Sequence, residues 1–413
     1  MFLNYSNNKK ILYLNDRHEE TDTDKEDRRK LYDKRILPLL KKNDGAIFAE
    51  KIDPFLWDYY KNLGFAAIKK ENIFYVQDYL NYPSLTKAVL DNQSLIQKIK
   101  QRNFDILVPY IESSDTQILA QKIDCRILRE ASFTDWINNK TNYRQIIKEL
   151  DFPMIPGFSA KNLEQAKKYF RSLKNQGFKE IVLKKERSVA GFGIFVIKTE
   201  KELGKLLEKE FSNQKQFLLE GFIEGIKITP NVQYWVDSKK INFINVADQL
   251  LEKDKISYAG NVFPSQLRQM HNIRKKIENL SLKFCDYLQK QKCYGLVGID
   301  WIVDKNDNIY TTEANVRLNA STFVHFITNQ LFDSSDEIFW KTFTLHCSSI
   351  LFRDLFERFS KNFIIKKGQS GVFPVGVDLL QSLGEGQFIV IGNSLEEIYA
   401  LEKKFKKKIQ NEE

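Results

Sequence analysis

Residues 295–319 read GLVGIDWIVDKNDNIYTTEANVRLN. Two apolar runs, residues 296–303 and 309–312, lie on either side of the polar linker DKNDN. Aromatic and β-branched residues around such a linker predict a β-hairpin. Charged side chains interrupt the apolar strands of this hairpin, which indicates a functional site. The rest of the chain is therefore interpreted around it.

The polar residues of the hairpin have the chemistry of a metal site. Asp300 stands inside the first apolar run, where a carboxylate needs a partner. Glu313, Asn315 and Arg317 alternate, so an extended chain would place them on one face, which Asp300 can join from the neighbouring strand. Two carboxylates and an amide oxygen suit Mg²⁺, which takes its remaining ligands from water and phosphates. The alternative is a group of solvated turn residues, the usual explanation of an isolated Glu-x-Asn pair.

The composition is that of a globular protein with two or three domains. The chain has 413 residues, of which 42% are hydrophobic and 29% charged. Its net charge of +10 is compatible with nucleic acid, acidic membranes or phosphate ligands. Most lysines are mixed with acidic residues, which is typical of solvated helix faces and argues against a specific nucleic-acid partner. The densest basic group is expected on the polar side of a last helix: Lys403, Lys404, Lys406, Lys407 and Lys408.

Nothing in the sequence indicates export or membrane insertion. The first ten residues lack an apolar signal-peptide core, and no apolar run has the length of a membrane span. The four cysteines form no Cys-x-x-Cys pair, and no histidine lies at zinc-site spacing from them. We therefore expect a cytoplasmic protein with no membrane partner.

Residues 1–130 alternate between strand and helix patterns. Helices are expected at residues 25–42 and 85–101, among others, and the strongest strand at residues 104–111. This alternation favours a parallel sheet with helices outside it. No G-x-G-x-x-G occurs here, so the sequence gives no support for a dinucleotide-binding fingerprint.

Three segments in the middle of the chain would be ordinary structure if taken alone. Residues 134–158 predict a helix that contains Lys140 and ends at the prolines that follow. Residues 180–185 predict a strand ending in two lysines, and a loop with two glycines follows. That combination suits phosphate groups, although a plain hairpin with a flexible loop explains it equally. Residues 216–223 predict a half-buried strand with an exposed Glu220.

The last part of the chain gives weaker patterns. Residues 266–291 predict a long amphipathic helix that leads back to the hairpin. Beyond Thr322, residues 323–331 and 340–359 predict helices. Residues 363–366, 370–377 and 387–391 predict strands of a small C-terminal unit.

Asp300 followed by Glu313-x-Asn315-x-Arg317 resembles the metal and phosphate signature of the ATP-grasp superfamily. D-alanine–D-alanine ligase and biotin carboxylase share the Glu-x-Asn pair, and residues 317–322 resemble the pheganomycin-type peptide ligases. The resemblance covers residues 134–322 and implies an α/β (α+β) ATP-grasp fold. It also implies an N-terminal Rossmann-like pre-ATP-grasp domain at residues 1–130 and an ATP-grasp domain at 131–335, with its hinge near 220–223. Residues 336–413 would form a C-terminal extension of helices and strands.

The resemblance implies a role for each candidate residue. The metal ligands would be Asp300, Glu313 and Asn315. Lys140 and Lys184 would bind the α- and β-phosphates, with Lys185 as the fallback for Lys184. The loop that contains Ser188, Gly191 and Gly193 would close over the γ-phosphate. The adenine would be read by Glu220 and by the backbone of Gly221, Phe222 and Ile223. Arg317, which would meet the acylphosphate or the carboxylate, and Asn319 would be the catalytic residues.

The implied reaction is ATP-dependent joining of a carboxylate, from an amino acid or peptide, to an amine. It would pass through an acylphosphate and release ADP and phosphate, with ATP and Mg²⁺ required and Mn²⁺ as an alternative cation. Two alternatives stay open: a nucleotide-binding regulator or inactive relative, and a ligase that acts on a protein or carrier-bound substrate. Lys227 departs from the family, in which many members have a ribose-binding glutamate; either Glu224 takes over the ribose or the sugar is held less specifically. The expected partners are small molecules, and a homodimer is compatible with the sequence.

Overall fold

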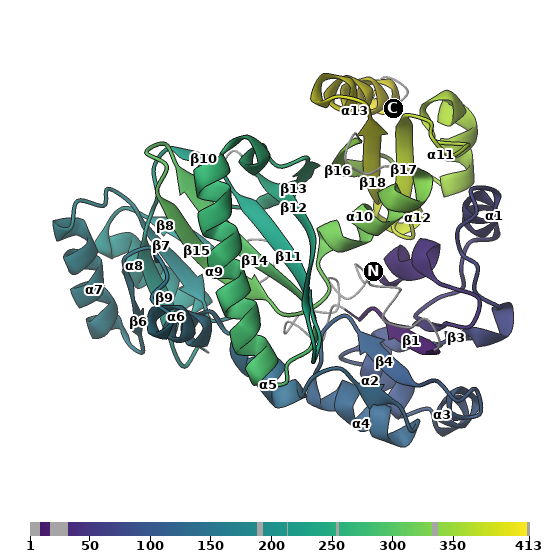
Figure 1. The fold of residues 1–413 in the computed structure, drawn as a ribbon, viewed down its shortest axis with the longest axis horizontal. Helices are drawn as coiled ribbons and strands as arrows, with labels where there is room; N and C mark the ends of the chain where they lie inside the picture. The colour runs from purple at the N-terminus through teal and green to yellow at the C-terminus, as the bar shows by residue number, and fades with distance from the viewer. Residues whose placement is uncertain are drawn as a thin grey trace. The chain divides into compact units, whose positions relative to one another are not determined.

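The structure is a computed structural model that describes residues 9–16, 32–187, 193–212, 214–252, 256–332 and 338–410. The chain divides into two compact units. The first unit contains Met1–Ser132, Gly260–Pro264 and Arg317–Glu413, and the second contains Phe133–Ala259 and Ser265–Val316 (Figure 1). The division into domains at residues 1–130, 131–335 and 336–413 stays a prediction.

The N-terminal part of the first unit is the expected parallel sheet with helices around it. Its strand order is β3-β2-β1-β4-β5. The strands are β1 Ile11–Leu14, β2 Gly45–Phe48, β3 Ile73–Tyr75, β4 Ile106–Pro109 and β5 Arg126–Ile127. The helices are α1 Pro54–Asn62, α2 Leu85–Leu90, α3 Gln93–Lys100 and α4 Ser114–Lys122, with short 3₁₀ helices at Asp33–Leu39, Lys70–Asn72 and Tyr79–Asn81. Asp53 caps α1 by accepting a hydrogen bond from the Leu56 N–H, and Pro54 follows it.

Two helices expected in this part were wrong in extent. The expected helix at residues 25–42 is a 3₁₀ helix at Asp33–Leu39 within the described residues, and it contains Pro38, which lacks the N–H that a longer helix needs. The expected helix at residues 85–101 is divided between α2 and α3. The side chain of Asn92 accepts a hydrogen bond from the Leu95 N–H and so starts a new helix.

The C-terminal part of the first unit is an antiparallel sheet with helices. Val262 and Phe263 of strand β13 (Tyr258–Phe263) pair with β16 Phe339–His346, which is followed by β18 Glu385–Gly392 and β17 Gly371–Gly376. The helices are α10 Ala320–Leu331, α11 Phe352–Phe359, α12 Leu380–Leu383 and α13 Leu395–Gln410, with a 3₁₀ helix at Ser360–Asn362. The expected helix at 340–359 was wrong in its first half. FWKTFTLH is rich in aromatic and β-branched residues and forms β16.

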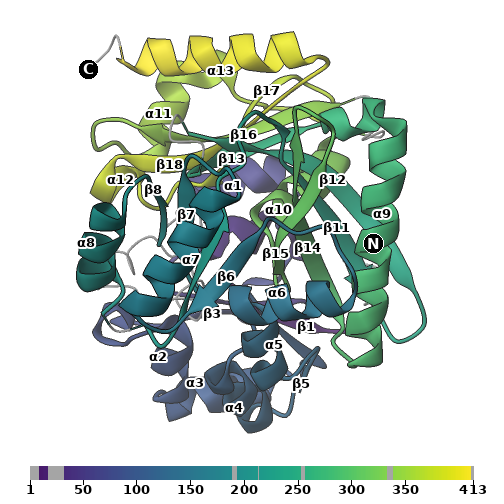
Figure 2. The same cartoon turned by 90° about the vertical axis from the view of Figure 1, so that its left-hand side faces the viewer.

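The second unit contains two antiparallel sheets. The smaller sheet has the order β6-β9-β7-β8, with β6 Gly157–Ala160, β9 Phe217–Gly221, β7 Ile181–Lys185 and β8 Ile194–Ile197. Helices α7 Leu163–Asn175 and α8 Glu200–Glu210 pack beside each other against it (Figure 2). Thr199 and Glu202 form the expected capping box of α8.

The larger sheet contains the hairpin. Its strands in this unit are β10 Ile226–Ile228, β14 Gly295–Asp304, β11 Pro230–Val236, β12 Ile241–Leu251 and, paired with β14, β15 Ile309–Asn315. The helices of this part are α5 Ala131–Ile137, α6 Lys140–Glu149 and α9 His271–Lys290, preceded by a 3₁₀ helix at Gln266–Gln269.

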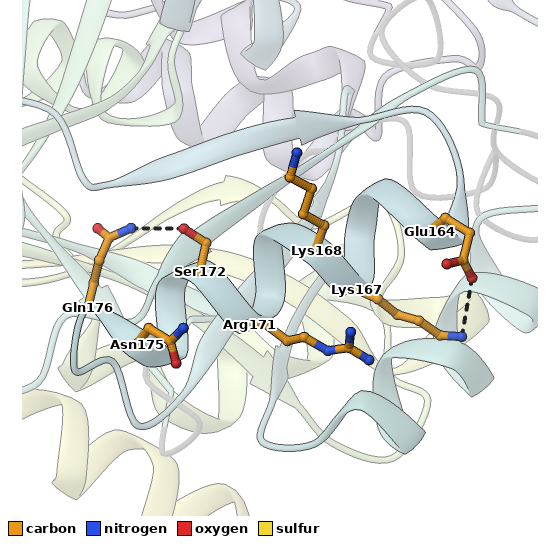
Figure 3. Close-up of a pocket in the computed structure, with 7 residues that line it drawn as sticks. All are labelled: Glu164, Lys167, Lys168, Arg171, Ser172, Asn175 and Gln176. Atoms are coloured by element: carbon orange, nitrogen blue, oxygen red, sulfur yellow. Dashed lines mark hydrogen bonds and ion pairs between the residues drawn. The ribbon is translucent and has the colours of Figure 1, made fainter.

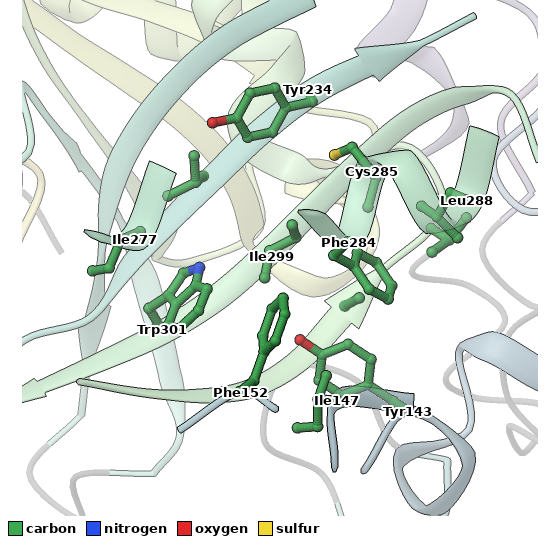
Figure 4. Packing of buried hydrophobic residues seen from close by; sticks show 14 of the residues in the cluster. Tyr143, Ile147, Phe152, Tyr234, Ile277, Phe284, Cys285, Leu288, Ile299 and Trp301 are labelled. Carbon is green, nitrogen blue, oxygen red and sulfur yellow. The ribbon is translucent and has the colours of Figure 1, made fainter. Parts of the chain in front are cut away.

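One hydrophobic core fixes α6 and α9 against the larger sheet. Tyr143 and Ile147 of α6 meet Phe284, Cys285 and Leu288 of α9, together with Trp301 of β14 (Figure 4). The Trp301 ring stacks on Phe152, and its Nε1 donates to Ser281 Oγ at 3.2 Å. Because these side chains are almost completely buried, the core holds the start of α6 and the β14–β15 hairpin in one arrangement.

No helix in the described part of the chain combines the length and the apolar content needed to cross a membrane.

Candidate functional site

The hairpin brings the predicted metal ligands together. Asp300 of β14 lies directly opposite Glu313 of β15, and Asn315 lies opposite Gly298 on the same pair of strands. Asn315 Nδ2 donates to Asp300 Oδ2 at 2.9 Å. The predicted turn is also formed, because Asp304 Oδ1 accepts from the N–H groups of Asn306 and Asn308, each at 2.9 Å. A register shift in the strand pairing between Asp300 and Trp301 thus brings both carboxylates and the amide together on one hairpin.

The electrostatics of this pair of acids suit a divalent cation. Burial, together with the neighbouring Glu313 carboxylate, raises the pKa of Asp300 to about 7, against the lowering effect of hydrogen bonds from Asn231 and Gln249. Two acids that disfavour each other's charge would both ionise more readily beside a cation. No group of three or more His, Cys, Asp or Glu side chains able to hold a metal was found among the described residues. A site here would therefore use two carboxylates and the Asn315 amide, which fits Mg²⁺ with waters and phosphates as its other ligands.

A row of amides supports Asp300 from β11. Asn231 Nδ2 donates to Asp300 Oδ1 at 2.5 Å, and Gln233 Nε2 donates to Asn231 Oδ1 at 2.7 Å. Asn231 and Asp300 lie opposite each other in the register of the two strands. We did not predict these residues, although two buried polar side chains two positions apart in an otherwise apolar strand, PNVQYWV, were an available signal.

Lys140 lies at the start of α6 and reaches the hairpin. Its Nζ lies 2.7 Å from Glu313 Oε2, and the side chain is 5% exposed. Asn139 caps the helix by accepting from the N–H groups of Thr141 and Asn142, and the Lys140 N–H donates to the Glu186 carbonyl at 3.0 Å. The predicted phosphate lysine is thus paired with a predicted metal ligand.

Contacts at both ends of α6 hold it along β15. Tyr143 Oη and Thr311 Oγ1 are hydrogen-bonded at 2.5 Å, and the Thr311 N–H donates to the Pro153 carbonyl at 3.2 Å. At the other end, the Val316 N–H donates to Asn138 Oδ1 at 2.9 Å. These contacts fix where Lys140 stands relative to Glu313.

Glu220 of β9 lies between two cations. Its Oε2 is 2.5 Å from Lys184 Nζ, and its Oε1 accepts from Arg144 Nη1 at 2.6 Å. Arg144 Nη2 also donates to the carbonyls of Ile155, at 2.8 Å, and Gly157, at 3.1 Å. Glu220 is buried, whereas the sequence alone suggested an exposed side chain. We did not predict Arg144, although its position four residues after Lys140 places both on one helix face.

Two backbone N–H groups of the predicted hinge already donate hydrogen bonds within the protein. The Gly221 N–H donates to the Pro156 carbonyl at 2.9 Å, and the Phe222 N–H donates to the Glu180 carbonyl at 3.0 Å. A Cβ on Gly221 would lie 2.3 Å from the Phe178 ring, so close packing requires the glycine. Reading of the adenine by Glu220 and the backbone from Gly221 to Ile223 stays a prediction.

The structure separates the two lysines at the end of β7. Lys184 points to Glu220, whereas Lys185 lies 3.8 Å from Glu210 and over the Phe211 ring. The Lys185 N–H donates to the carbonyl of Gly193, which has a φ of 76° and therefore favours glycine. Ser188 and Gly191 of the predicted phosphate loop lie outside the described residues. Lys184 remains the better candidate for the predicted phosphate-binding lysine because it is paired with Glu220, another predicted site residue.

Lys227 and Glu224 lie on the surface in ion pairs. They are the two residues considered for the ribose, where many ATP-grasp proteins have a glutamate. Lys227 Nζ is 2.9 Å from Asp307, and Glu224 is 3.5 Å from Lys179. Both pairs are largely exposed, so rearrangement around a ribose would cost little.

Arg317 and Asn319 belong to the first unit and follow the end of β15. The Arg317 guanidinium lies over the Tyr110 ring, 5.3 Å from its centre, and Nη1 donates to the Leu318 carbonyl at 3.0 Å. Asn319 Nδ2 donates to the Arg317 carbonyl at 2.9 Å. The expectation that Arg317 shares one wall with Glu313 and Asn315 stays a prediction.

A shallow depression lies on the surface of α7, away from these residues. It is lined by charged and amide side chains, with Lys168, Arg171 and Gln176 among them (Figure 3). Arg171 forms an exposed bidentate pair with Glu200 at 2.6 and 2.8 Å. This depression contains none of the predicted site residues.

Comparison with known proteins supports the resemblance to the ATP-grasp superfamily. A family model described as an ATP-grasp domain matches residues 137–321. The butirosin acyl-carrier protein–L-glutamate ligase of Niallia circulans is 23% identical over 300 residues, which cover 71% of this chain and 65% of that protein. The match therefore spans less than two thirds of the length of this curated relative.

Solved structures share the fold along nearly the whole chain. Biotin carboxylase from Campylobacter jejuni has a TM-score of 0.63 at 15% identity and covers 95% of this chain and 89% of its own. L-amino acid ligase from Bacillus licheniformis has a TM-score of 0.60 at 13% identity, covering 98% and 97%. An ADP complex of PurK, N5-carboxyaminoimidazole ribonucleotide synthetase, has a TM-score of 0.63 at 13% identity and covers 96% of each chain. These similarities confirm the predicted fold class.

Proposed function

Because residues 137–321 of this chain belong to the ATP-grasp family, we propose that the protein is an ATP-dependent ligase that joins a carboxylate to an amine. The observation that carries the proposal is the Asp300–Glu313–Asn315 group, with Lys140 2.7 Å from Glu313. Acids, an amide and a lysine in this arrangement suit a nucleotide's phosphates and their cation.

The proposed reaction has two steps. An oxygen of the carboxylate attacks the γ-phosphorus of ATP, which breaks the bond to ADP and gives an acylphosphate. The nitrogen of the amine then attacks the acyl carbon, loses a proton and displaces inorganic phosphate. Neither step needs an oxidant or a covalent bond to the protein, so the protein contributes positioning and charge neutralisation.

The predicted site residues have places in this scheme. Asp300, Glu313 and Asn315 would hold Mg²⁺ or Mn²⁺, which when bound neutralises charge on the phosphate oxygens. Lys140 and Lys184 would neutralise the α- and β-phosphates. Asn231 keeps the Asp300 carboxylate oriented through its 2.5 Å hydrogen bond. Arg317, through its planar guanidinium, would meet the carboxylate or acylphosphate.

The substrates are proposed by class. An amino acid or peptide carboxylate and a small amine are supported by the fold shared with L-amino acid ligase. A carrier-bound substrate is the second candidate, and the Niallia circulans relative supports it because its name includes an acyl-carrier protein. A regulatory or inactive ATP-grasp protein is a third possibility, against which the complete set of predicted metal ligands argues.

The nucleotide product tests this proposal. The purified protein is incubated with ATP, Mg²⁺ and pools of amino acids and dipeptides, with and without an acyl-carrier protein, and the nucleotides are separated by chromatography. We expect ADP and phosphate in equal amounts, formed only when an acceptor is present. AMP with pyrophosphate as the sole products would show an adenylate route instead. The absence of turnover from a protein that binds Mg-ATP tightly would favour the regulatory alternative.

A further inference from the structure

Lys140 and Glu313 are each expected to bind a different ligand, yet they bind each other in the structure. Lys140 is the predicted partner of the phosphates and Glu313 a predicted ligand of the cation. Their charged atoms lie 2.7 Å apart, a distance typical of a charge-assisted hydrogen bond. The ammonium therefore stands beside the carboxylate that a divalent cation would need.

The contacts of α6 fix the backbone positions of the two paired residues. Asn139 caps the helix, the Lys140 N–H is bonded to Glu186, and the Tyr143–Thr311 hydrogen bond ties the helix to the strand that carries Glu313. The backbone positions of Lys140 and Glu313 are thus set by several independent contacts. The flexible end of the lysine side chain can therefore exchange one partner for another without movement of the helix.

We propose that Lys140 is the built-in counter-ion of Glu313, which excludes a lone divalent cation and gives way to a cation that arrives with a nucleotide. A lone cation would place two positive charges beside the ammonium of Lys140, whose side chain is only 5% exposed. A cation that arrives with a triphosphate brings anionic oxygens, so Lys140 exchanges the carboxylate for a phosphate. This proposal rests on the proposed function, and it adds the consequence that metal and nucleotide enter as one complex.

The test measures metal binding without turnover. Mn²⁺ is titrated into the nucleotide-free protein at constant pH, and electron paramagnetic resonance gives the concentration of unbound Mn²⁺. We expect Lys140→Gln to bind Mn²⁺ at least about tenfold more tightly than the unmodified protein, the factor that corresponds to one charge-assisted hydrogen bond. The same variant should bind the complex of Mg²⁺ with a non-hydrolysable ATP analogue more weakly, measured by calorimetry.

Three matched variants locate the effect. Lys184→Gln removes the other predicted phosphate lysine, which is paired with Glu220, so its Mn²⁺ affinity should stay unchanged. The double variant Lys140→Gln with Glu313→Gln should lose the gain, because the carboxylate is gone. Lys140→Arg keeps the charge and should bind Mn²⁺ as weakly as the unmodified protein, which provides a second comparison if Lys140→Gln fails to fold.

An unchanged or weaker Mn²⁺ affinity in a folded Lys140→Gln variant would overturn the counter-ion proposal. Tight Mn²⁺ binding by Lys140→Arg would also overturn it. These outcomes are separate from the proposed function, because binding of the Mg²⁺–ATP analogue and ADP formation are measured independently. Tighter Mn²⁺ binding in Lys140→Gln together with no nucleotide binding by the unmodified protein would retain the counter-ion and reject the ligase.

Discussion

Arg144→Gln removes a guanidinium that makes three hydrogen bonds in the second unit. It bonds to Glu220 at 2.6 Å and to the carbonyls of Ile155 and Gly157. The side chains of Arg144 and Glu220 are 15% and 5% exposed, so the substitution leaves a buried carboxylate with Lys184 as its remaining cation. Breaking a buried ion pair by removing one partner costs about 3–5 kcal/mol. For a unit of this size, that loss lowers the melting temperature by roughly 6–20 °C.

The assay is a thermal melt followed by circular dichroism, and the chain offers a matched control. Arg171 makes an equally short bond to Glu200 at 2.6 Å, but that pair is on the surface. Arg171→Gln should therefore leave the melting temperature almost unchanged, because solvent screens an exposed pair. The double variant Arg144→Gln with Glu220→Gln should lose less stability than the two single variants added together, because Arg144, Glu220 and Lys184 form one ion-pair network. Equal melting temperatures for Arg144→Gln and Arg171→Gln would refute the argument that burial makes the Arg144 pair important.

Three further predictions concern the site and the first unit. Glu313→Gln keeps the shape of a predicted metal ligand but removes its charge, so ATP turnover should fall by at least about two orders of magnitude; near-normal turnover would remove the metal assignment. Arg317→Lys keeps the charge but loses the planar fork, so product formation should be lost while folding and Mg-ATP affinity are retained; a loss of nucleotide affinity or stability together with activity would indicate a structural role instead. Burial raises the pKa of Asp33 to about 6, so the folded state binds this proton more tightly than the unfolded state, and stability falls as the pH rises from about 4 to 6. In thermal melts across this pH range, Asp33→Asn should reduce that fall by about 1–3 kcal/mol. An equal reduction by the exposed control Asp58→Asn would contradict the assignment to Asp33.

Local signals explain what the sequence could predict. The hairpin follows from two apolar runs around DKNDN. A register shift between Asp300 and Trp301 then places Glu313 opposite Asp300, and the alternating pattern alone does not predict that shift. The caps at Asp53 and Thr199 follow from residues within four positions of each other. The hairpin and the caps are each decided by neighbours in the sequence.

Pairs between distant segments were not predictable in the same way. Arg144 and Glu220 are 76 positions apart, and the sequence of neither segment indicates that the other is its partner. Glu220 was expected to be exposed because an isolated acid in a strand usually is, and only the two cations supplied by α6 and β7 explain its burial. The wrong helix at residues 340–359 had a different cause. The aromatic and β-branched residues of β16 indicated a strand, but the strand runs into a genuine helix after a short turn.

The fixed attachment of α6 at both ends has a consequence for the permitted length of the chain. Asn138 is hydrogen-bonded to Val316, and Pro153 is hydrogen-bonded to Thr311, so the segment between them must have a fixed length along β15. One residue inserted within α6 would rotate everything on one side of it by about 100°. Depending on the point of insertion, Lys140 would turn away from Glu313, Tyr143 from Thr311, or Ile147 from the core. We therefore expect insertions and deletions among functional relatives to fall outside residues 138–153, while the amino acids on the outer face of α6 are free to vary.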